Sequence, residues 1–514
     1  MPFAFSLYGL PFIQYCSFSR VSGLIVIFAY MLRFPAFLLL VFLLCAGFFS
    51  SSCRKDPLDE DSDAQLVFSR DTVRFDTVFT TVGSTYRRFK AYNFSSKSVM
   101  VSSIRLAGGA NSQFRLNVDG VPGTDFTDIK IRGGDSLWIF AEVTVDPTSQ
   151  NSPMLITDSV IFVTNGNIQR VLLEAVGQNV YLHYPTFVTT SGVAYSYFNC
   201  NEVWTNDKPH LIFGLAIIPS NCTLTMQPGT RVHLHNGGVL AADSNATLIV
   251  NGAHGSEVTI QGDRLEQEYS EEPGQWGYIW LSANSVNNSI NWAIIRNGTI
   301  GILSDSVGSS ANPTVNIANT KIRNMSLAGI FGRDTYIRGN NLLVTNCAQY
   351  AAALAYGGKY SFTHCTFANY WNIDNRTTPA VIINNWYEDA DGNPVRRNLD
   401  SANFRNCIIH GDLDNEFEPD SNTTGGYNFR YYVTNTLLKT TINASDPVHF
   451  NVPTNGINQL VAFTDFANHD FTLAPGSWAR NKGDAILALP YLNDLNNLSR
   501  FASGAPDAGA YEGQ

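Results

Sequence analysis

Five segments of the sequence decide the fold: AIIRN (293–297), TKIRN (320–324), LLVTN (342–346), CTFAN (365–369) and CIIHG (407–411). When they are aligned on their last residue, large apolar side chains recur at the third position and small or apolar ones at the first. Side chains of a β-strand alternate between two faces, so both columns point to one side, the interior. The first intervals are about 22 to 27 residues, in the range of solenoid repeats. The segments therefore predict stacked parallel strands, a β-helix, in which each rung buries its neighbour.

The end of each segment predicts a sharp bend. Asparagine tolerates left-handed backbone geometry, and its amide can bond to the equivalent amide of the next rung. We therefore expect a structural asparagine ladder. Cys365 and Cys407 share the first, inward column and are interpreted as small interior residues rather than catalytic ones. The fifth segment ends in Gly411, and the other four end in Asn297, Asn324, Asn346 and Asn369.

The composition fits an all-β protein that does not bind nucleic acid. The 514 residues are 44% hydrophobic and 15% charged, with a net charge of -10 and a pI near 5.4. Proteins that bind nucleic acid carry clustered Lys and Arg, which excludes that class of partner. The length exceeds what one hydrophobic core serves and predicts two domains or one elongated repeat body.

Residues 66–180 show short alternating strands between turn signals, a pattern typical of a β-sandwich. A strand that ends near Asn93, a VDP turn at 145–147 and a closing LLEAVG at 172–177 resemble the immunoglobulin-like domains related to the ASPM, SPD-2 and hydin group. The resemblance implies a spacer or adhesion module, and we assign no chemistry to it.

Residues 181–514 resemble right-handed parallel β-helix proteins of the pectin-lyase-like and choice-of-anchor Q group. The resemblance rests on LTMQPGTRVHL at 224–234 and on the end of the chain, DFTLAPGSWARNKGD at 470–484 with PDAGAYE at 506–512. The chain departs from that group at Trp478 and at residues 480–482. The resemblance implies a C-terminal cap over the last rung, where an open β edge would invite aggregation.

The first 52 residues resemble the signal peptide of a bacterial lipoprotein. A basic MLR at 31–33, an apolar stretch at 34–49 and three serines precede Cys53, in a pattern similar to lipoproteins of the Bacteroidota. This implies a signal segment at 1–52, with Met31 as its true start, and lipidation of Cys53, which would anchor the protein to the outer membrane and the cell surface. The acidic residues that follow predict a solvated tether over 53–65. The alternative is a membrane-spanning helix over about 23–49.

The cysteines and acidic residues predict no metal site and no cofactor. Five cysteines follow Cys53, and no spacing among them or the histidines is typical of a zinc site. An odd number leaves at least one free thiol in an oxidising compartment, and Cys200 could pair with Cys222. A site for Ca²⁺ has no ligand motif to support it.

The residues just before the predicted bends point outward and include the candidate catalytic residues. Arg296 and Arg323 form a basic strip that could grip acidic sugars, and His410 lies in the same column. No recognisable catalytic set accompanies them. The acidic residues of 412–418 are interpreted as a solvated loop. The aromatic tract 276–280 either offers platforms for sugar rings or fills the interior.

Two functions remain open. The first is a non-catalytic surface lipoprotein that binds glycans or partner proteins along its β-helix, with the sandwich as a spacer. The second is a carbohydrate-active enzyme, a lyase or a hydrolase, which cleaves an acidic polysaccharide with the face that carries Arg296 and Arg323. The sequence leaves undecided whether the protein is an enzyme.

If Cys53 carries lipid, Cys53→Ser should move the protein from the detergent-soluble membrane fraction to the soluble fraction, because no acyl chain then partitions into the bilayer. Palmitate labelling should disappear with it. Membrane retention of the variant would support the spanning helix instead.

Overall fold

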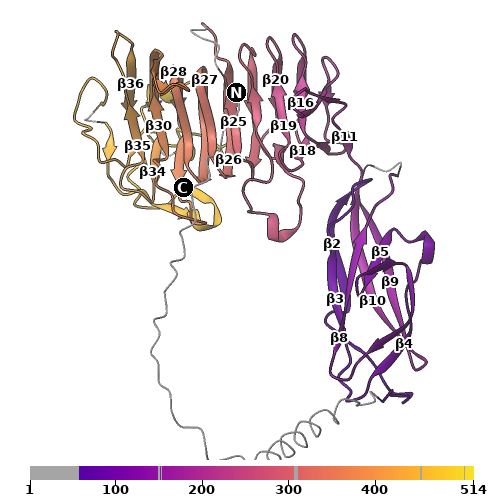
Figure 1. Ribbon diagram of the computed structural model, residues 1–514. Coiled ribbons are helices and arrows are strands. Elements are labelled where there is room, and N and C mark those ends of the chain that lie inside the picture. Colours follow the sequence, from indigo (N-terminus) through magenta and orange to yellow (C-terminus); the bar gives the residue numbers. More distant parts are fainter. Residues whose placement is uncertain are drawn as a thin grey trace, which may run out of the picture.

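The computed structural model of this protein describes residues 57–148, 151, 153–305, 311–451, 454–502 and 504–513 (Figure 1). These residues form an N-terminal β-sandwich and a long parallel β-helix whose rungs lie side by side. Cys53 and the signal segment lie outside the described residues. No helix in the described part of the chain is long and apolar enough to cross a membrane.

The sandwich consists of two five-stranded sheets, with strand orders β1-β3-β8-β5-β6 and β2-β10-β9-β4-β7. Inward side chains of both sheets, among them Phe89, Phe114 and Phe162, form one buried core, as the alternating pattern predicts. The elements are β1 (Val67–Phe68), β2 (Thr72–Phe79), β3 (Arg87–Tyr92), β4 (Val99–Leu106), η1 (Gly109–Asn111), β5 (Phe114–Val118), β6 (Val121–Gly123), β7 (Asp125–Ile131), β8 (Ser136–Val143), β9 (Met154–Thr164) and β10 (Asn167–Gln178).

The described part of the predicted tether, residues 57–65, packs against the sandwich instead of extending into solvent. The side-chain amide of Asn165 donates to the backbone oxygen of Asp59 at 2.7 Å, and that of Asn167 donates to the backbone oxygen of Ala64 at 3.1 Å. Leu58 forms a β-bridge with Ser98. Most side chains of this part are exposed to solvent, and side-chain amides of the folded sandwich bond to its backbone, so it is solvated but attached to the sandwich.

The β-helix winds with three strands per rung. From β13 to β23, each strand pairs in parallel with the strand three elements later, as β17, β20 and β23 do. Its first strands are β11 (Tyr181–His183), β12 (Phe187–Val188), β13 (Ala194–Tyr197), β14 (Val203–Trp204), β15 (His210–Ile212), β16 (Leu215–Ile218), β17 (Thr223–Met226), β18 (Arg231–Leu234), β19 (Val239–Ala242), β20 (Thr247–Asn251), β21 (Val258–Gly262), β22 (Ile279–Leu281), β23 (Asn288–Asn291), β24 (Ala293–Arg296) and β25 (Ile300–Ser304), with the short helix η2 (Gln267–Tyr269) in a loop.

The later strands begin with three long ones that continue from one side of the stack to the next, and the rest are short. They are β26 (Val315–Met325), β27 (Ala328–Cys347), β28 (Tyr350–Thr363), β29 (Thr366–Asn369), β30 (Val381–Asn384), β33 (Leu399–Arg405), β34 (Ile408–Gly411), β35 (Phe417–Asp420), β36 (Phe429–Thr434), β37 (Leu437–Leu438) and β38 (Gly456–Ile457), with a side hairpin of β31 (Trp386–Glu388) and β32 (Pro394–Arg396).

The stack has three lateral faces, which we name by their strands. Face A contains β18, β21, β24, β29, β34 and β37; face B contains β19, β22, β25, β30 and β35; and face C contains β17, β20, β23, β33 and β36. β27 runs through all three faces in the order B, C and A, because it pairs first with β25 and then with both halves of β26.

The strand register agrees with the alignment of the five repeats. Ile295 pairs with Ile322, Ile322 with Val344, Val344 with Phe367, and Phe367 with Ile409. All five side chains are fully buried, and so are Cys365 and Cys407, which confirms that these columns face the interior. The core of the β-helix is thus the apolar column that the sequence repeats.

The predicted asparagine ladder is only partly formed. Three of its four asparagines adopt left-handed geometry, and Asn324 donates to the side-chain oxygen of Asn297 at 3.3 Å. Asn369 instead bonds to both backbone groups of Cys347, at 2.8 and 2.9 Å. Gly411 leaves room for a buried carboxylate, since a Cβ there would lie 2.2 Å from Glu416. These side chains therefore bond mostly to other nearby groups and less to one another.

A second column of bends carries the better ladder, and the sequence analysis missed it. It lies one position before each repeat segment. Asn341 donates to Asn319, and Asn319 donates to Asn291, both at 2.9 Å. Left-handed geometry at this column recurs from rung to rung, with φ between 48° and 54° at Trp292, Asn319, Asn341, His364, Asn406 and Asn435.

Aromatic rings close the first rung. Trp204 stacks on His210 with centroids 3.9 Å apart, and the two histidines His183 and His210 bond to each other at 3.0 Å. Burial lowers the pKa of His183 to about 4 and that of His210 to about 3, so both rings are neutral near pH 7. Their uncharged rings shield the end of the apolar core from water.

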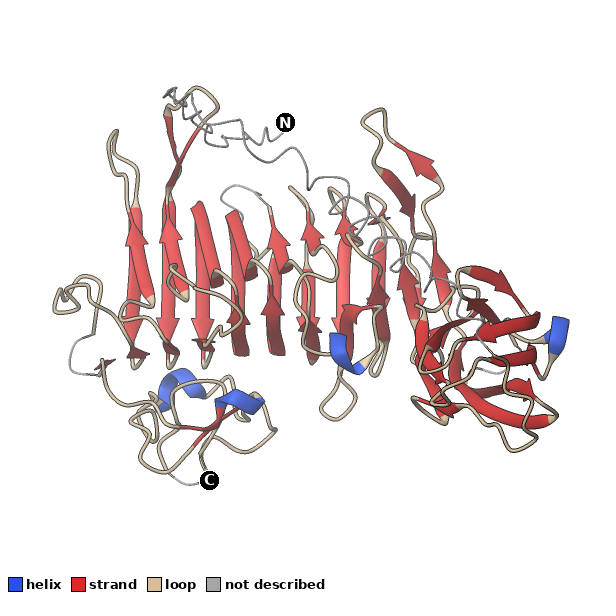
Figure 2. Ribbon diagram, turned by 60° about the horizontal axis from the view of Figure 1, so that its bottom comes forward, coloured by secondary structure: helices blue, strands red, loops and turns tan. Residues whose placement is uncertain are grey.

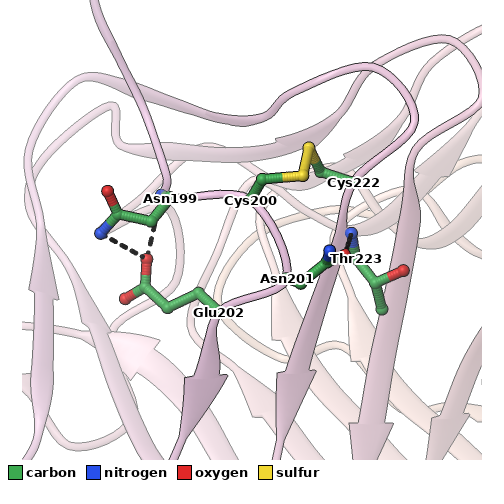
Figure 3. Close-up of a disulfide and its surroundings, with 6 residues drawn as sticks. All are labelled: Asn199, Cys200, Asn201, Glu202, Cys222 and Thr223. Atoms are coloured by element: carbon green, nitrogen blue, oxygen red, sulfur yellow. Dashed lines mark hydrogen bonds between the residues drawn. A yellow bond between two sulfur atoms is a disulfide. The ribbon is translucent and has the colours of Figure 1, made fainter.

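A disulfide between Cys200 and Cys222 ties the first rung to the second (Figure 3). It joins the loop before β14 to the start of β17, two strands that pair in parallel. The pairing that the sequence left open is therefore formed. Closing a loop of 22 residues in this way stabilises a fold by about 3 kcal/mol.

The C-terminal segment, residues 463–513, packs along face A and the bends beside it, not over the last rung (Figure 2). Arg500 donates to Asn341 at 2.9 Å, and Asp484 exchanges two bonds with Asn406. The predicted cap is therefore wrong in its position, because the second column of asparagines offers the segment polar partners along the flank. Its elements are β39 (Phe463–Asp465), η3 (Phe466–Asn468), β40 (Asp470–Leu473) and α2 (Ala485–Ala488).

Asn341→Ala should lower the free energy of unfolding by about 2–4 kcal/mol, because it removes the hydrogen bonds of Asn341 to Asn319, Asn493 and Arg500. Urea unfolding followed by circular dichroism measures the loss. Asn284→Ala is the matched control, since Asn284 is also left-handed, with φ 67°, but is exposed. Only the backbone cost of about 1 kcal/mol is expected there. Equal losses would contradict the role of the second column.

Candidate functional site

Arg296 and Arg323 lie side by side on face A, as the sequence predicts, but they are already engaged. Glu271, from the loop after β21, accepts two bonds from Arg323, one of them at 2.9 Å, and lies 3.8 Å from Arg296. His469 of the C-terminal segment lies 3.1 Å from the same carboxylate. Arg296 also donates to Gln261 at 2.7 Å.

The electrostatics of this cluster favour a structural role. Burial raises the pKa of Glu271, but hydrogen bonds and charge from His469 and Arg323 outweigh it and lower the pKa to about 2. The carboxylate is thus charged at all physiological pH values and offsets one of the strip's two positive charges. Asn324 donates to the same carboxylate at 2.7 Å. The basic strip therefore joins the loop and the C-terminal segment to face A and is not free to grip an acidic sugar.

His410 is not brought together with the two arginines. The register runs from Arg323 through Thr345 and Ala368 to His410, three strand spacings or about 14 Å. Thr345 and Ala368 are buried between them. His410 accepts or donates a bond to the hydroxyl of Tyr370 at 2.8 Å, and burial lowers its pKa to about 4. The three candidates therefore do not form one site.

The acidic loop after His410 is not simply solvated. Glu416 is fully buried and forms a bidentate pair with Arg376, at 2.6 and 2.8 Å. It also accepts the backbone N–H groups of Leu413 and Ala380. The solvated-loop interpretation is wrong for this residue, because a buried arginine from a distant loop meets it. Among the described residues, no group of three or more His, Cys, Asp or Glu could hold a metal ion.

In the aromatic tract 276–280, one tryptophan fills the interior and another points outward. Trp276 is fully buried and donates to the backbone oxygen of Arg296 at 2.9 Å, so it fills the interior. Trp280 points outward on face B and donates to Asp305 at 2.8 Å. It is half-buried against neighbouring rungs.

Face C presents four outward cations, in three neighbouring columns of the register, that the sequence analysis did not single out. Successive strands β27, β28, β33 and β36 each contribute one outward cation, and adjacent strands lie about 4.8 Å apart. None of the four has an ion-pair partner among the described residues. The four cations are Arg338, Lys359, Arg405 and Arg430.

Polar and aromatic side chains accompany the cations. Arg338, Ser361, Asn403 and Tyr432 form one outward column of face C. Arg338 donates to the hydroxyl of Tyr336 at 3.1 Å, so its guanidinium is oriented along the face. Face C therefore offers charge, amide and hydroxyl groups on one strip.

The strip ends in a hollow of about 400 Å³ at the last rungs. Tyr431 forms one wall, and its ring stacks on His449 with centroids 4.0 Å apart. Burial raises the pKa of Tyr431 to about 12, so its hydroxyl stays protonated. The described lining contains a single carboxylate, Asp400. The lining residues are Asp400, Ser401, Asn403, Arg430, Tyr431, Tyr432, Val448 and His449.

The sequence pattern that predicts the strands of face C lies just before the aligned segments in the chain. Residues 336–340 and 359–363 alternate buried and outward side chains, as the repeat segments do. Aligning the chain on the second column of bends would have placed Arg338 and Ser361 in one outward column. The repeat segments themselves belong to face A and contain none of the four cations.

Comparison with known proteins gives only distant likenesses. No family model and no curated protein matches the chain. A family 123 glycoside hydrolase from Clostridium perfringens, a protein described for glycolipid glycan hydrolysis, is 8% identical, and the match covers 26% of each chain with a TM-score of 0.17.

Two further structures are catalytic parts of GH87 alpha-1,3-glucanases. One, in complex with tetrasaccharides, is 13% identical over 68% of this chain and 80% of that chain, with a TM-score of 0.18. The other, from Streptomyces thermodiastaticus, is 7% identical over 72% and 88%, with a TM-score of 0.16. These likenesses are too distant to assign an activity.

Glu271→Gln should destabilise the protein by about 0.5–1 kcal/mol, a small loss because the carboxylate is half-exposed and screened by solvent. The carboxylate's pKa is lower in the folded state, so its contribution is complete above pH 4.5 and is lost as pH falls towards 2. Melting temperatures of both proteins should therefore differ most at pH 6 and converge only as pH falls to about 2. A difference that stays constant over this range would contradict the ion cluster.

Proposed function

We propose that this protein binds an acidic polysaccharide along face C of its β-helix. The observation that carries the proposal is one outward cation on each of four successive strands, spread over three columns of the register, without internal ion-pair partners in the described part of the chain. Guanidinium groups pair well with carboxylate or sulfate groups, and Arg338, Arg405 and Arg430 supply three of them. The four cations follow the stack within a band about 13 Å wide along the strands, which suits a polymer that lies across the strands.

The charge balance supports face C over the strip on face A. The whole chain has a net charge of -10, so a local row of cations is not a general property of its surface. Arg296 and Arg323 share Glu271 and His469, and an acidic sugar would have to displace that carboxylate. The cations of face C need no such displacement.

We further propose that the protein is an outer-membrane lipoprotein anchored through Cys53, with its β-helix outside the cytoplasm. The disulfide between Cys200 and Cys222 supports this placement, because such bonds persist in oxidising compartments. An anchored protein of this kind would hold an acidic polysaccharide near the cell surface.

Cleavage of the bound chain is the second candidate, and the hollow at the end of face C favours elimination over hydrolysis. Hydrolysis by paired carboxylates needs two of them, and Asp400 is the only carboxylate in the described lining. Arg430 and His449 line the same hollow. The guanidinium would neutralise a uronate carboxylate, and the imidazole would take the proton beside it as the bond to the leaving sugar oxygen breaks, leaving a carbon–carbon double bond.

The double variant Arg338→Ala/Arg405→Ala should weaken binding of polygalacturonate at least 10-fold, because two charge-assisted contacts are lost. Affinity electrophoresis of the purified protein in gels with and without the polymer measures this change. Binding should also weaken as salt rises, since the contacts are ionic.

The matched control is Arg105→Ala/Arg170→Ala, which removes the same charge from exposed positions of the sandwich. Equal weakening by both double variants would overturn the role of face C. The same incubations, assayed for unsaturated sugar ends, decide between the two candidates. Unsaturated products that disappear in His449→Ala would establish cleavage, and intact polymer would leave binding alone.

A further inference from the structure

The outer surface of one sandwich sheet is aromatic where a solvated sheet is normally polar. In β3 and β8 the inward residues are buried, and the alternate ones point to solvent. Outward residues of β3 include Arg88, Lys90 and Tyr92, and those of β8 include Trp138 and Phe140. The pairing of Lys90 with Trp138 and of Arg88 with Phe140 places them in one strip.

The rings of this strip are accessible. Phe94 is 71% exposed and Trp138 39% exposed. Tyr92 and Phe94 lie parallel, at 5° with centroids 5.3 Å apart, and Trp138 and Phe140 have centroids 6.2 Å apart. From Phe94 to Arg88 the strip spans about 20 Å along the strand. We call these residues, Arg88, Lys90, Tyr92, Phe94, Trp138 and Phe140, the sandwich strip.

Two cations lie within the sandwich strip. The ammonium of Lys90 is 4.4 Å from the ring centroid of Trp138, and the guanidinium of Arg88 is 5.0 Å from it. Neither cation has an ion-pair partner among the described residues. The strip therefore combines flat apolar surfaces with positive charge that the sandwich itself does not neutralise.

We propose that the sandwich strip is a second binding site for an acidic glycan. Ring faces can pack against the C–H faces of successive sugar rings, while Arg88 and Lys90 bond to their carboxylate or sulfate groups. A lipid bilayer fits this strip less well, because Lys90 lies in its middle and Arg88 at its end, and burying these cations in an acyl layer would be costly. A neutral glycan would leave the two cations without partners.

This inference rests on the proposed function for the class of ligand and adds a site on the other domain. The two sites belong to domains that are held together: β10 ends at Gln178 and β11 begins at Tyr181. Thr85 donates to Glu266 at 3.0 Å, and Arg87 donates to Glu268 at 2.6 Å. A polymer that reaches both sites would bind more tightly than a short fragment, because the second contact is intramolecular.

The test uses the full mature chain and tetragalacturonate as a short probe. Isothermal titration of the unmodified protein should give two sites per molecule. Trp138→Ala should leave one site and weaken binding of long polygalacturonate at least 10-fold, and Arg88→Glu/Lys90→Glu should act in the same way by reversing the charge. Ile168→Ala is the matched control, because Ile168 is 66% exposed on the opposite sheet of the sandwich.

The outcomes separate this inference from the proposed function. If both sandwich variants still bind tetragalacturonate at two sites, the sandwich strip is not a binding site, and the proposal for face C is unaffected. If the sandwich variants lose one binding site and Arg338→Ala/Arg405→Ala leaves binding unchanged, the result supports the sandwich strip as a binding site and contradicts the proposal for face C. No binding of either probe by the unmodified protein would overturn both. The protein could instead bind neither probe but bind phosphatidylglycerol vesicles, with Trp138→Ala abolishing that binding. This outcome would assign the strip to a lipid surface and overturn the inference.

Discussion

The rest of the structure depends on the spacing of about 4.8 Å between parallel strands in register. Because each rung repeats the one before it, a residue type suited to the interior must recur in the same column, as Ile295, Ile322 and Val344 do. The chain must also turn sharply between faces without losing its backbone hydrogen bonds. Left-handed asparagines at two columns of bends meet that demand, since their side chains bond to neighbouring rungs or to segments beside them.

The bends determine how the flank of the β-helix is covered. The amides of Asn341 and Asn406 face outward at the second column, and residues of the C-terminal segment bond to them. Arg500 also pairs with Glu512, and burial raises the pKa of that carboxyl to about 7 although Arg500 opposes the shift. Such a buried pair costs desolvation and holds only with good geometry. Its hydrogen bonds explain why the PDAGAYE motif at 506–512 is structural.

Two properties decide which face is available to a ligand: whether another segment packs over the face, and whether its charged side chains are already paired. Face A is covered by the C-terminal segment over Leu343 and Ala368, and Glu271 pairs with both of its arginines. On face C, Arg338 and Arg430 are exposed, and on the sandwich strip the rings of Phe94 and Trp138 are exposed. The same kind of residue, an outward arginine on a β-strand, is thus a structural contact on one face and a candidate ligand contact on another.

The sequence by itself determined the β-helix, its inner columns and its strand register, because period-two alternation and the repeat interval are local properties of the chain. It also placed Arg296 beside Arg323. Only the tertiary structure decided what those residues do, since Glu271 lies 52 residues from Arg323, and Asn341 lies 159 residues from Arg500. Partners that far apart meet through the winding of the stack and the return of the C-terminal segment, which no local pattern encodes. A free cation and a neutralised one look alike in the sequence, because the difference is the distance to a carboxylate that folding alone sets.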